Sequence, residues 1–318
     1  MNILALKKCI CKPPSIALAL LVLLFSGCTT PGPSEVSEDT VTVRDASLFV
    51  KTMGSGEPIV FVHGGPGLEH SYFLPHVAEM AKKNTLVFYD QRANGRSEIG
   101  DTTAFTMDQF VEDLDAVRQH IKADKIHLLG HSWGGLIAMR YALKHQDKLH
   151  SLILMNTNAA SAAVQQAAGQ RLQARITPAD QEAQAALFQT EAFQKREPAA
   201  LNEFFRLSFK SSFFDPEKTN ELSFYFDEQF SEKSAALGRL RADSTLPFYD
   251  LHDNLGSMQT PTLIIHTTHD PLTLDDISLI DHAIPNSKLV VIENSGHFPF
   301  IEQYEDLSRH IQDFLTDH

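Results

Sequence analysis

Basic residues and cysteines are both scarce in this chain of 318 residues. It has 27 Lys and Arg residues against 40 Asp and Glu residues, which gives a net charge of −13 at pH 7. A surface of this sign repels nucleic acid and anionic lipid headgroups, so we expect no nucleic-acid partner. Only three cysteines occur, and no pair of histidines has the His-Glu-x-x-His spacing of a zinc site. We therefore expect no disulfide framework and no metal site.

Long hydrophobic runs are also missing, with one exception near the N-terminus. Lys7, Lys8 and Lys12 precede an uninterrupted apolar run from Ile16 to Phe25. A membrane-spanning helix needs about 20 apolar residues, so this run is too short to anchor the chain by itself. A basic start followed by a short apolar run predicts a secretory signal peptide over residues 1–27 and export of the remainder.

The end of this segment, LFSGC, resembles the lipobox of bacterial lipoproteins, in which the cysteine is lipidated and becomes the new N-terminus. The resemblance implies that Cys28 holds the protein to a membrane of the bacterial cell envelope. Thr29 in place of aspartate implies the outer membrane in a Gram-negative cell. Cleavage by an ordinary signal peptidase is the alternative, since Phe25 stands where the family has a smaller aliphatic residue. Residues 28–39 are predicted to form a flexible polar tether.

Apolar β-type runs alternate with helix-type segments through most of the remaining chain. Unbroken runs of this kind suit parallel strands that are buried on both faces. They occupy residues 58–63, 85–90, 125–130, 151–156, 262–267 and 288–293. An antiparallel pair is expected around residues 41–51, and a helix over residues 106–121 has a plausible capping box from Thr106 and Gln109. The pattern predicts an α/β fold with an eight-stranded, mostly parallel sheet and flanking helices.

The alternation stops between residues 158 and 247. This segment is rich in Ala, Gln, Glu and Phe and has no β-type run. Roughly 90 residues are too many for a connecting loop. We predict a helical cap inserted after the sixth strand, which divides the core into residues 40–157 and 248–318. Some of its phenylalanines could line an apolar pocket, because a cap over a reaction site shapes the substrate and excludes water.

The hexapeptide GHSWGG at residues 130–135 lies between an apolar run, 125–129, and a helix-type run, 136–143. A strand, a sharp turn and a helix in this order are the setting of a nucleophile elbow. Small neighbours are required there because the serine has a strained backbone and must lift its hydroxyl clear of the sheet. Ser132 is therefore the candidate nucleophile of a hydrolase.

A serine nucleophile needs an imidazole base and a carboxylate that orients it. The chain has fifteen histidines, so chain order must select among them. In the elbow arrangement the acid and then the histidine follow the serine, on loops after late strands. Asp270 and His297 satisfy this order. Their alternative interpretations are a turn aspartate and a surface-loop histidine.

Backbone N–H groups must also stabilise the oxyanion of a tetrahedral intermediate. Trp133 follows the nucleophile and is expected to supply one of them. The second is expected from the loop HGGPG, residues 63–67, directly after a predicted strand. Gly65 is the first candidate for this role and Gly64 the second. His63 is expected to hold the loop in place and not to act as a second base.

HGGPG, YDQRANGRS at residues 89–97, GHSWGG, the late aspartate and SGH together resemble the proline iminopeptidase branch of the α/β-hydrolases. The resemblance covers roughly residue 41 to the C-terminus and implies the α/β-hydrolase fold. It also implies an aminopeptidase that releases N-terminal proline, or a similar small residue, from short peptides through an acyl-enzyme. Ser132, Asp270 and His297 take the roles of the triad, and no cofactor is implied.

Two departures from the family leave the substrate open. Ala93 and Asn94 stand where the family usually has glycine and a small residue, and the cap lacks the family's Trp-Glu pair, because Trp133 is the only tryptophan. The available cap acids are Glu203, Asp227 and Glu228. A carboxylesterase for short or medium acyl esters is therefore the second hypothesis, and a binding or sensing protein on the same fold is the third. The oligomeric state is not predicted.

Overall fold

The structure is a computed structural model that describes residues 36–102, 105–240 and 246–318. The predicted signal peptide and Cys28 lie outside the described residues. The tether was predicted to extend to residue 39, but residues 36–39 belong to the first strand, so that boundary was wrong. Among the described residues, no helix is both long enough and apolar enough to cross a membrane.

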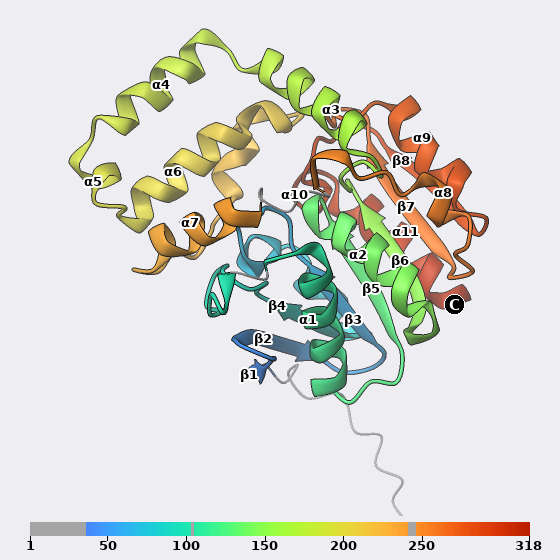
Figure 1. The fold of residues 1–318 in the computed structure, drawn as a ribbon. Helices are drawn as coiled ribbons and strands as arrows, with labels where there is room; N and C mark the ends of the chain where they lie inside the picture. The colour runs from blue at the N-terminus through green and yellow to red at the C-terminus, as the bar shows by residue number, and fades with distance from the viewer. Residues whose placement is uncertain (1–35, 103–104, 241–245) are drawn as a thin grey trace, which may run out of the picture. The chain divides into compact units, whose positions relative to one another are not determined.

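Eight strands form one mixed sheet in the order β1-β2-β4-β3-β5-β6-β7-β8 (Figure 1). β2 pairs antiparallel with β1 and with β4, and the remaining pairings are parallel. The eight-stranded sheet predicted from the apolar runs is confirmed. The strands are β1 Val36–Thr42, β2 Ser47–Gly54, β3 Pro58–Val62, β4 Thr85–Tyr89, β5 Ile126–His131, β6 Leu149–Met155, β7 Thr262–Thr267 and β8 Ser287–Ile292.

Both faces of the sheet are buried along its central strands β3 to β7, which explains why these strands are apolar without alternation. Val60 and Val62 of β3 belong to one core, whereas Ile59 and Phe61 belong to the core on the opposite face. The first core includes residues of α1 Met107–His120, α2 Trp133–His145, α8 His252–Leu255 and α9 Leu274–Ala283. The second includes residues of η1 His70–Phe73, η2 Ala78–Lys82, α10 Pro299–Glu302 and α11 Tyr304–Asp317.

Helix α1 occupies the predicted segment, but the capping box expected at its start does not form. The side chain of Thr106 makes no capping hydrogen bond. Gln109 instead donates through Nε2 to Asp45 Oδ1, 3.1 Å away in the turn after β1. The helix is stabilised by its apolar stripe, in which Phe110 and Leu114 are buried against the sheet. Tertiary packing therefore replaces the local cap.

The segment between β6 and β7 is helical in its described part and leads away from the sheet and back (Figure 1). We call residues 158–247 the insertion. Its elements are α3 Ala162–Arg175, α4 Pro178–Phe188, α5 Glu191–Gln194, α6 Pro198–Phe209, η5 Lys210–Ser212, η6 Pro216–Glu221, α7 Phe230–Leu240 and the start of η7, which runs from Leu246 to Phe248.

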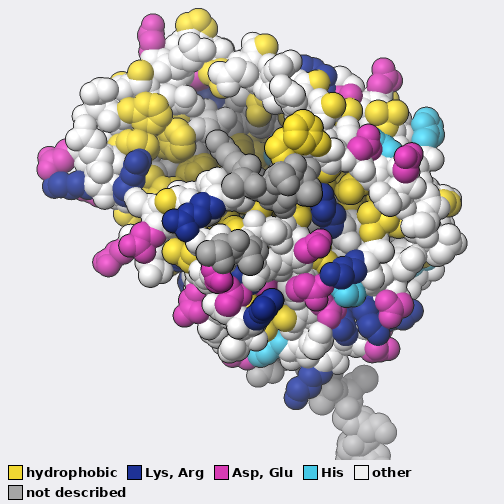
Figure 2. Space-filling view, in the orientation of Figure 1, with side chains coloured by type: hydrophobic (Ala, Val, Ile, Leu, Met, Phe, Trp, Pro, Cys, Tyr) yellow, Lys and Arg dark blue, Asp and Glu magenta, His cyan; other side chains and the backbone are white. Residues whose placement is uncertain are grey.

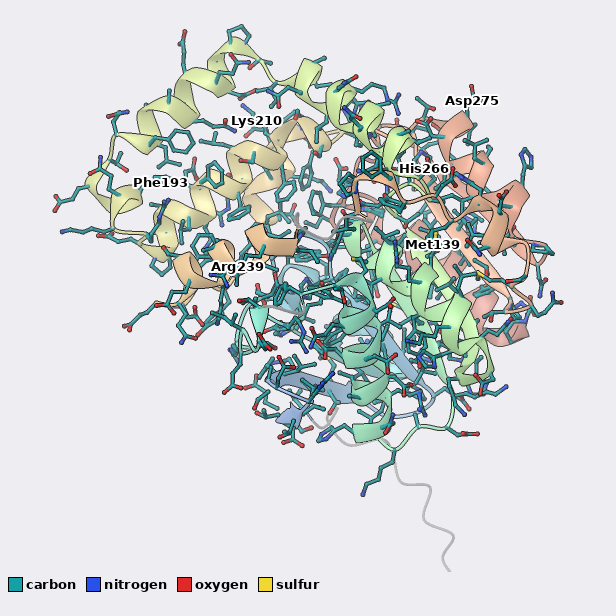
Figure 3. All side chains as sticks on the ribbon, viewed as in Figure 1. Met139, Phe193, Lys210, Arg239, His266 and Asp275 are labelled. Atoms are coloured by element: carbon teal, nitrogen blue, oxygen red, sulfur yellow. The ribbon has the colours of Figure 1, made fainter. Side chains whose placement is uncertain are left out.

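An aromatic cluster and an ion pair hold the outer helices of the insertion together. The ring of Phe193 in α5 lies 4.9 Å from that of Phe188 in α4 and 5.6 Å from that of Phe204 in α6 (Figure 3). Lys210 Nζ lies 2.8 Å from Asp180 Oδ1, which joins η5 to α4. Figure 2 shows hydrophobic side chains gathered where the surface is hollowed between α4 and α6.

Candidate active site

Five of the predicted site residues each follow a strand at the carboxyl edge of the parallel part of the sheet. Ser132 follows β5, Asp270 follows β7 and His297 follows β8, while Gly64 and Gly65 follow β3. Carboxyl ends of parallel strands meet at one edge, so residues that are distant in sequence are brought together there. This topology places all five candidates at the same edge.

Ser132 has the strained backbone that the elbow motif predicts. Its φ is 56° and its ψ is −125°, a conformation that L-residues rarely adopt. The turn closes through a hydrogen bond from the N–H of Gly135 to the carbonyl of Ser132, 2.9 Å long. A methyl group on Gly134 would collide with the carbonyls of Val62 and His63, which explains the glycine after Trp133. The serine is partly buried at the tip of the turn.

Asp270 and His297 lie in direct contact. Asp270 Oδ2 is 2.7 Å from His297 Nδ1, and the aspartate side chain is only 1% exposed. Burial alone would raise the pKa of the Asp270 carboxyl, but the charge and hydrogen bond of His297 outweigh it and hold that pKa below its usual range. Two further donors reach the carboxylate: Asn156 Nδ2 at 2.8 Å and the N–H of Leu272 at 2.9 Å. The aspartate is therefore held as a fixed anion.

The ring of His297 faces the nucleophile elbow. Its centroid is 4.9 Å from that of His131, the residue before Ser132, and its side chain is 14% exposed. Among the described residues, no hydrogen bond joins Ser132 Oγ to His297 Nε2. Such bonds are often long in proteins without substrate and tighten in the substrate complex. The structure thus brings the acid and the imidazole together, with the serine on the neighbouring loop.

The HGGPG loop lies against the elbow, as an oxyanion loop would. A Cβ added to Gly64 would be 3.0 Å from Ser132 Cβ. The N–H of Gly64 already donates to the Tyr72 hydroxyl at 2.6 Å, so Gly64 is a poor second candidate for oxyanion donor. Gly65, the first candidate, has a φ of 125°, which favours glycine. Trp133 is the first residue of α2, where an N–H has no acceptor within its own helix.

Gln91 explains part of the DQR motif, because it ties the HGGPG loop to the elbow. Its Nε2 donates to the carbonyl of His63 at 2.7 Å, and its Oε1 accepts from Trp133 Nε1 at 3.1 Å. Its backbone N–H donates to His63 Nε2 at 3.0 Å, while His63 Nδ1 lies 2.7 Å from the Gly64 carbonyl. His63 therefore has the loop-holding position that the sequence predicted.

Arg92 of the same motif is fully buried, and two acids compensate its charge. It donates through Nε and Nη2 to the two carboxylate oxygens of Asp113 in α1, at 2.6 and 2.7 Å. Asp45 lies 3.3 Å from Nη1. This bidentate contact fixes the segment after β4 against α1. The motif is therefore structural at this position.

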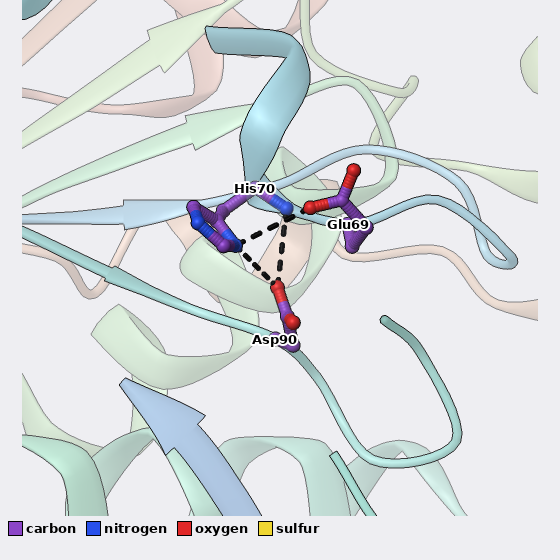
Figure 4. A group of neighbouring side chains, drawn as sticks. All are labelled: Glu69, His70 and Asp90. Carbon is purple, nitrogen blue, oxygen red and sulfur yellow. Dashed lines mark hydrogen bonds and ion pairs between the residues drawn. The ribbon is translucent and has the colours of Figure 1, made fainter. Parts of the chain in front are cut away.

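Glu69, His70 and Asp90 form a buried cluster beside the HGGPG loop (Figure 4). His70 Nδ1 is 2.6 Å from Asp90 Oδ1 and 3.3 Å from Glu69 Oε2. Donor groups already occupy the carboxylate oxygens: the N–H of Arg96 donates to Asp90 Oδ2, and the N–H of Tyr225 donates to Glu69 Oε1. Burial raises the pKa of the Glu69 carboxyl. The cluster therefore anchors the insertion through Tyr225. We assign no metal to it, because N–H donors already occupy the carboxylate oxygens.

The insertion also contacts the loop that carries His297. The N–H of His297 donates to the carbonyl of Ser212 at 2.8 Å. Glu302 accepts from Gly296 N–H through Oε2 at 2.6 Å and from Asp215 N–H through Oε1 at 2.8 Å. One carboxylate thus joins the histidine loop to the insertion. Sequence reasoning missed Glu302, because its partners are far from it in the chain.

Asn156 is a second residue that sequence reasoning missed. It follows β6 directly, and its Nδ2 donates both to Asp270 and to Thr267 Oγ1. Its φ is 42°, a conformation that asparagine tolerates better than most residues. A polar residue at the carboxyl end of a central strand was the available signal.

The three acids proposed from sequence as amine ligands differ in their surroundings. Asp227 pairs with Lys233 at 2.5 Å, and this lysine also donates to the carbonyl of Gly95 at 2.6 Å. Glu203 and Glu228 are exposed. Asp227 is therefore committed to a contact between the insertion and the loop after β4, and within the described part of the chain the other two acids have no ion-pair partner.

Two buried histidines should make the protein less stable as the pH falls below 7. Burial lowers the pKa of His63 to about 4 and that of His131 to about 3, whereas an unfolded histidine has a pKa of about 6.5. Between these values the unfolded chain binds more protons, so stability rises with pH in this window and is complete above about pH 6.5. When the pH falls from 7 to 5, protonation of each of these histidines in the unfolded chain should lower the free energy of unfolding by roughly 2 kcal/mol.

Urea unfolding of the wild type and of His63→Gln at pH 5 and pH 7 measures this effect. His63→Gln should show a smaller loss on acidification, whereas His282→Gln, which changes an exposed histidine of α9, should show the wild-type loss. Equal free energies of unfolding at the two pH values would contradict the prediction.

The arrangement of an elbow serine, a buried acid and an imidazole at the carboxyl edge of this sheet defines the class of the protein. Residues 57–304 match the model of the alpha/beta hydrolase fold family, and the chain belongs to that family. It is 29% identical over 261 residues to proline iminopeptidase of Thermoplasma volcanium. The matched region covers 81% of this chain and 88% of that relative. It is 30% identical over 273 residues to proline iminopeptidase of Lactobacillus delbrueckii subsp. lactis, and this match covers 81% of this chain and 90% of that relative.

The fold is similar to that of the crystal structure of proline iminopeptidase from Mycobacterium smegmatis. The TM-score is 0.65 at 22% identity, over 89% of this chain and 98% of that chain. Family membership and these relatives together identify the protein as a hydrolase.

Proposed function

We propose that this hydrolase works through Ser132, His297 and Asp270 and an acyl-enzyme intermediate. The observation that carries the proposal is the 2.7 Å contact between His297 Nδ1 and Asp270 Oδ2, on the loops after β8 and β7, beside the strained elbow of Ser132. A buried carboxylate at Nδ1 holds the proton there and leaves Nε2 unprotonated toward the serine. Nε2 can then accept the proton of the serine hydroxyl.

In the first half of the proposed reaction, Ser132 Oγ attacks the substrate carbonyl carbon while His297 Nε2 takes its proton. The resulting oxyanion accepts hydrogen bonds from the N–H groups of Trp133 and Gly65. The intermediate collapses when His297 returns the proton to the leaving amine or alcohol, which leaves an acyl group on Ser132. Water repeats the sequence with His297 as base, releases the acid and restores the serine.

We further propose that the insertion acts as a cap over this site. Its residues Ser212, Phe213 and Tyr225 contact the loops that carry His297 and follow β3. The rings of Phe213 and Phe298 stack at 4.9 Å directly after His297. Walls of this kind exclude water and strengthen the electrostatic interactions within a site.

The substrate that we propose is a short peptide with a free N-terminal proline or a similar small residue. The relatives named proline iminopeptidase support this choice, as do the motifs HGGPG and DQR. An N-terminal amine requires a carboxylate partner. Among the described residues, Glu203 and Glu228 have no ion-pair or hydrogen-bond partner for their side chains, and we assign the amine contact to this pair in place of Asp227.

A carboxylesterase is the second candidate, and the aromatic character of the insertion favours it. The ring of Phe209 lies 5.2 Å from that of Phe298, next to His297. Phe205 stacks on Phe226 at 5.3 Å, and Phe226 contacts Phe230 at 5.0 Å. An apolar wall beside the histidine suits an acyl chain as well as a proline ring.

Three arylamides and one ester separate these two candidates. The free prolyl arylamide, its N-acetyl derivative and the cyclopentanecarbonyl arylamide share one leaving group, and the last replaces the ring amine by a methylene. We expect kcat/KM for the free amine to exceed that for both analogues by about 10- to 100-fold, because the neutral analogues cannot make the charge-assisted hydrogen bond to the carboxylate. The wild type and a Ser132→Ala blank are assayed in parallel on all substrates, including a butyrate ester.

Serine-dependent cleavage of the ester, with no preference for the free amine, would establish the esterase instead. Equal rates on all three arylamides would also exclude an amine-binding acid.

Export and lipidation of Cys28 stay predictions from the sequence, because the residues concerned lie outside those described. We propose them on the pattern of lysines, apolar run and LFSGC. Mass determination of the N-terminal peptide from the native bacterial envelope tests both, since a diacylglyceryl group on Cys28 adds a characteristic mass.

A further inference from the structure

Three hydrogen bonds in series connect the HGGPG loop, the elbow and the histidine loop. The N–H of Gly64 donates to Tyr72 Oη at 2.6 Å. Tyr72 Oη lies 2.8 Å from His131 Nδ1, and His131 Nε2 lies 2.8 Å from the carbonyl oxygen of His297. The proposed mechanism assigns no role to Tyr72 or His131, although they link the two loops that supply the oxyanion donor and the base.

The protons in this series have one arrangement. A carbonyl only accepts, so His131 Nε2 must carry the hydrogen that faces His297. Burial lowers the pKa of His131 to about 3, which keeps the ring neutral and leaves Nδ1 as an acceptor. Tyr72 therefore donates to Nδ1 and accepts from Gly64, and each atom of the series has one defined partner.

Aromatic rings enclose the series and exclude water from it. Tyr72 and His131 are each 1% exposed. The Tyr72 ring lies 4.4 Å from that of Phe73 and 5.8 Å from that of Phe300, and the His131 ring lies 5.6 Å from that of Phe298. Hydrogen bonds are stronger in such surroundings, and a polar atom that loses its partner there is costly. The link is therefore stiff.

We propose that Tyr72 and His131 are positioning residues that hold the oxyanion loop and the His297 loop at a fixed separation across Ser132. The inference rests on the proposed function. Fixing the N–H of Gly64 also orients the next peptide group, whose N–H belongs to Gly65, the proposed oxyanion donor. At the other end, the bond to the carbonyl of His297 orients the residue whose ring must reach the serine.

Tyr72→Phe tests the proposal, because it removes one oxygen and keeps the ring in place. We expect kcat per active site to fall by about 10- to 100-fold with KM within about threefold of wild type, since misplacement of about 1 Å in an active site can cost 100-fold. The inhibition constant of a boronic acid, which becomes a tetrahedral anion on the serine, should rise by the same factor as kcat/KM falls. Fluorophosphonate titration supplies the concentration of active sites.

Tyr89→Phe is the matched control. Tyr89 is as deeply buried as Tyr72, and its hydroxyl has no hydrogen-bond partner among the described residues. This variant should keep the kcat and the boronic acid affinity of the wild type. A loss in Tyr72→Phe that reflects only reduced folding would lower the concentration of active sites and leave kcat per site unchanged.

A double-variant cycle tests whether the two residues act as one unit. His131→Leu removes the acceptor of Tyr72 and the donor to His297, and we expect it to lower kcat at least as much as Tyr72→Phe. The kcat of the double variant should be no more than about threefold below that of His131→Leu alone, because both substitutions interrupt the same series of hydrogen bonds. A loss of kcat in the double variant equal to the product of the two single losses would show that the residues act independently and would overturn the proposal.

Unchanged kcat and boronic acid affinity in folded Tyr72→Phe would also overturn it. If Tyr72→Phe does not fold, His131→Leu, which removes both hydrogen bonds of that residue, gives the same readout, and unchanged values there overturn the proposal as well. The proposed function and the positioning role can fail independently. Wild-type turnover by Ser132→Ala would show that Ser132 is not the nucleophile and would reject the proposed function. An inactive Ser132→Ala together with a fully active Tyr72→Phe would reject only the positioning role of Tyr72 and His131.

Discussion

Replacement of Ser132 by alanine should lower kcat on any substrate that the protein hydrolyses by about 10⁶-fold. The substitution removes the only atom that can form the acyl-enzyme in the proposed mechanism, and what remains is the activity of the oxyanion donors and of substrate binding. Alanine should occupy the same backbone conformation, at φ 56°, so the fold should persist. Steady-state rates on the preferred substrate, together with fluorophosphonate labelling, measure the effect.

Ser278→Ala is the control for this prediction. Ser278 lies in α9, where its hydroxyl donates to the carbonyl of Leu274 within the helix. It should retain the wild-type rate and the wild-type labelling. Turnover by Ser132→Ala within tenfold of wild type would show that another group is the nucleophile, and labelling of that variant would locate it.

Asp270→Asn should lower kcat by about 10⁴-fold and change KM little. The amide has nearly the same shape, but it carries no charge to stabilise the imidazolium of His297, and its NH2 group cannot accept the Nδ1 proton. The imidazole then tends to carry its proton on Nε2, where it cannot act as a base. Because the pKa of the Asp270 carboxyl is held low, the wild type keeps this charge throughout the physiological pH range. The rate is measured from pH 5 to pH 9.

Asp275→Asn is the control, since this exposed residue lies in the first turn of α9, close to Asp270 in sequence. It should leave kcat within about twofold of wild type. A tenfold or smaller loss in Asp270→Asn would mean that another carboxylate orients His297, and Glu302, which holds the same loop, would be the next residue to change.

The strands illustrate how far the sequence alone could lead. Their runs of Val, Ile and Leu indicate burial on both faces, and the runs match β3 to β8 within a few residues. The first strand was harder, because the residues of β1 before Val41 are exposed and read as a tether. Gln109 shows the opposite error: its spacing from Thr106 indicates a cap, but Asp45 offers it a tertiary partner.

The candidate site divides in the same way. The elbow around Ser132 is a local motif, since its strain and its glycines arise from residues adjacent in the chain. Asp270 and His297 could be selected from chain order, because the order of strands dictates which loops meet. The engagement of Gly64 by Tyr72 could not be read from the HGGPG motif. Neither could the two contacts of Glu302, whose acceptor atoms have no sequence pattern.

The sequence by itself determined the class of fold, the elbow and the three residues proposed for the reaction, because apolar runs, the glycines of the elbow and the order of the loops along the chain are all readable in it. Only the tertiary structure decided which side chains hold those residues in place. Asn156, Tyr72, His131 and Glu302 act through hydrogen bonds to partners on other loops. Such bonds form only when the donor and the acceptor lie within a few tenths of an ångström of the required separation. That placement arises only when the sheet has brought the loops together.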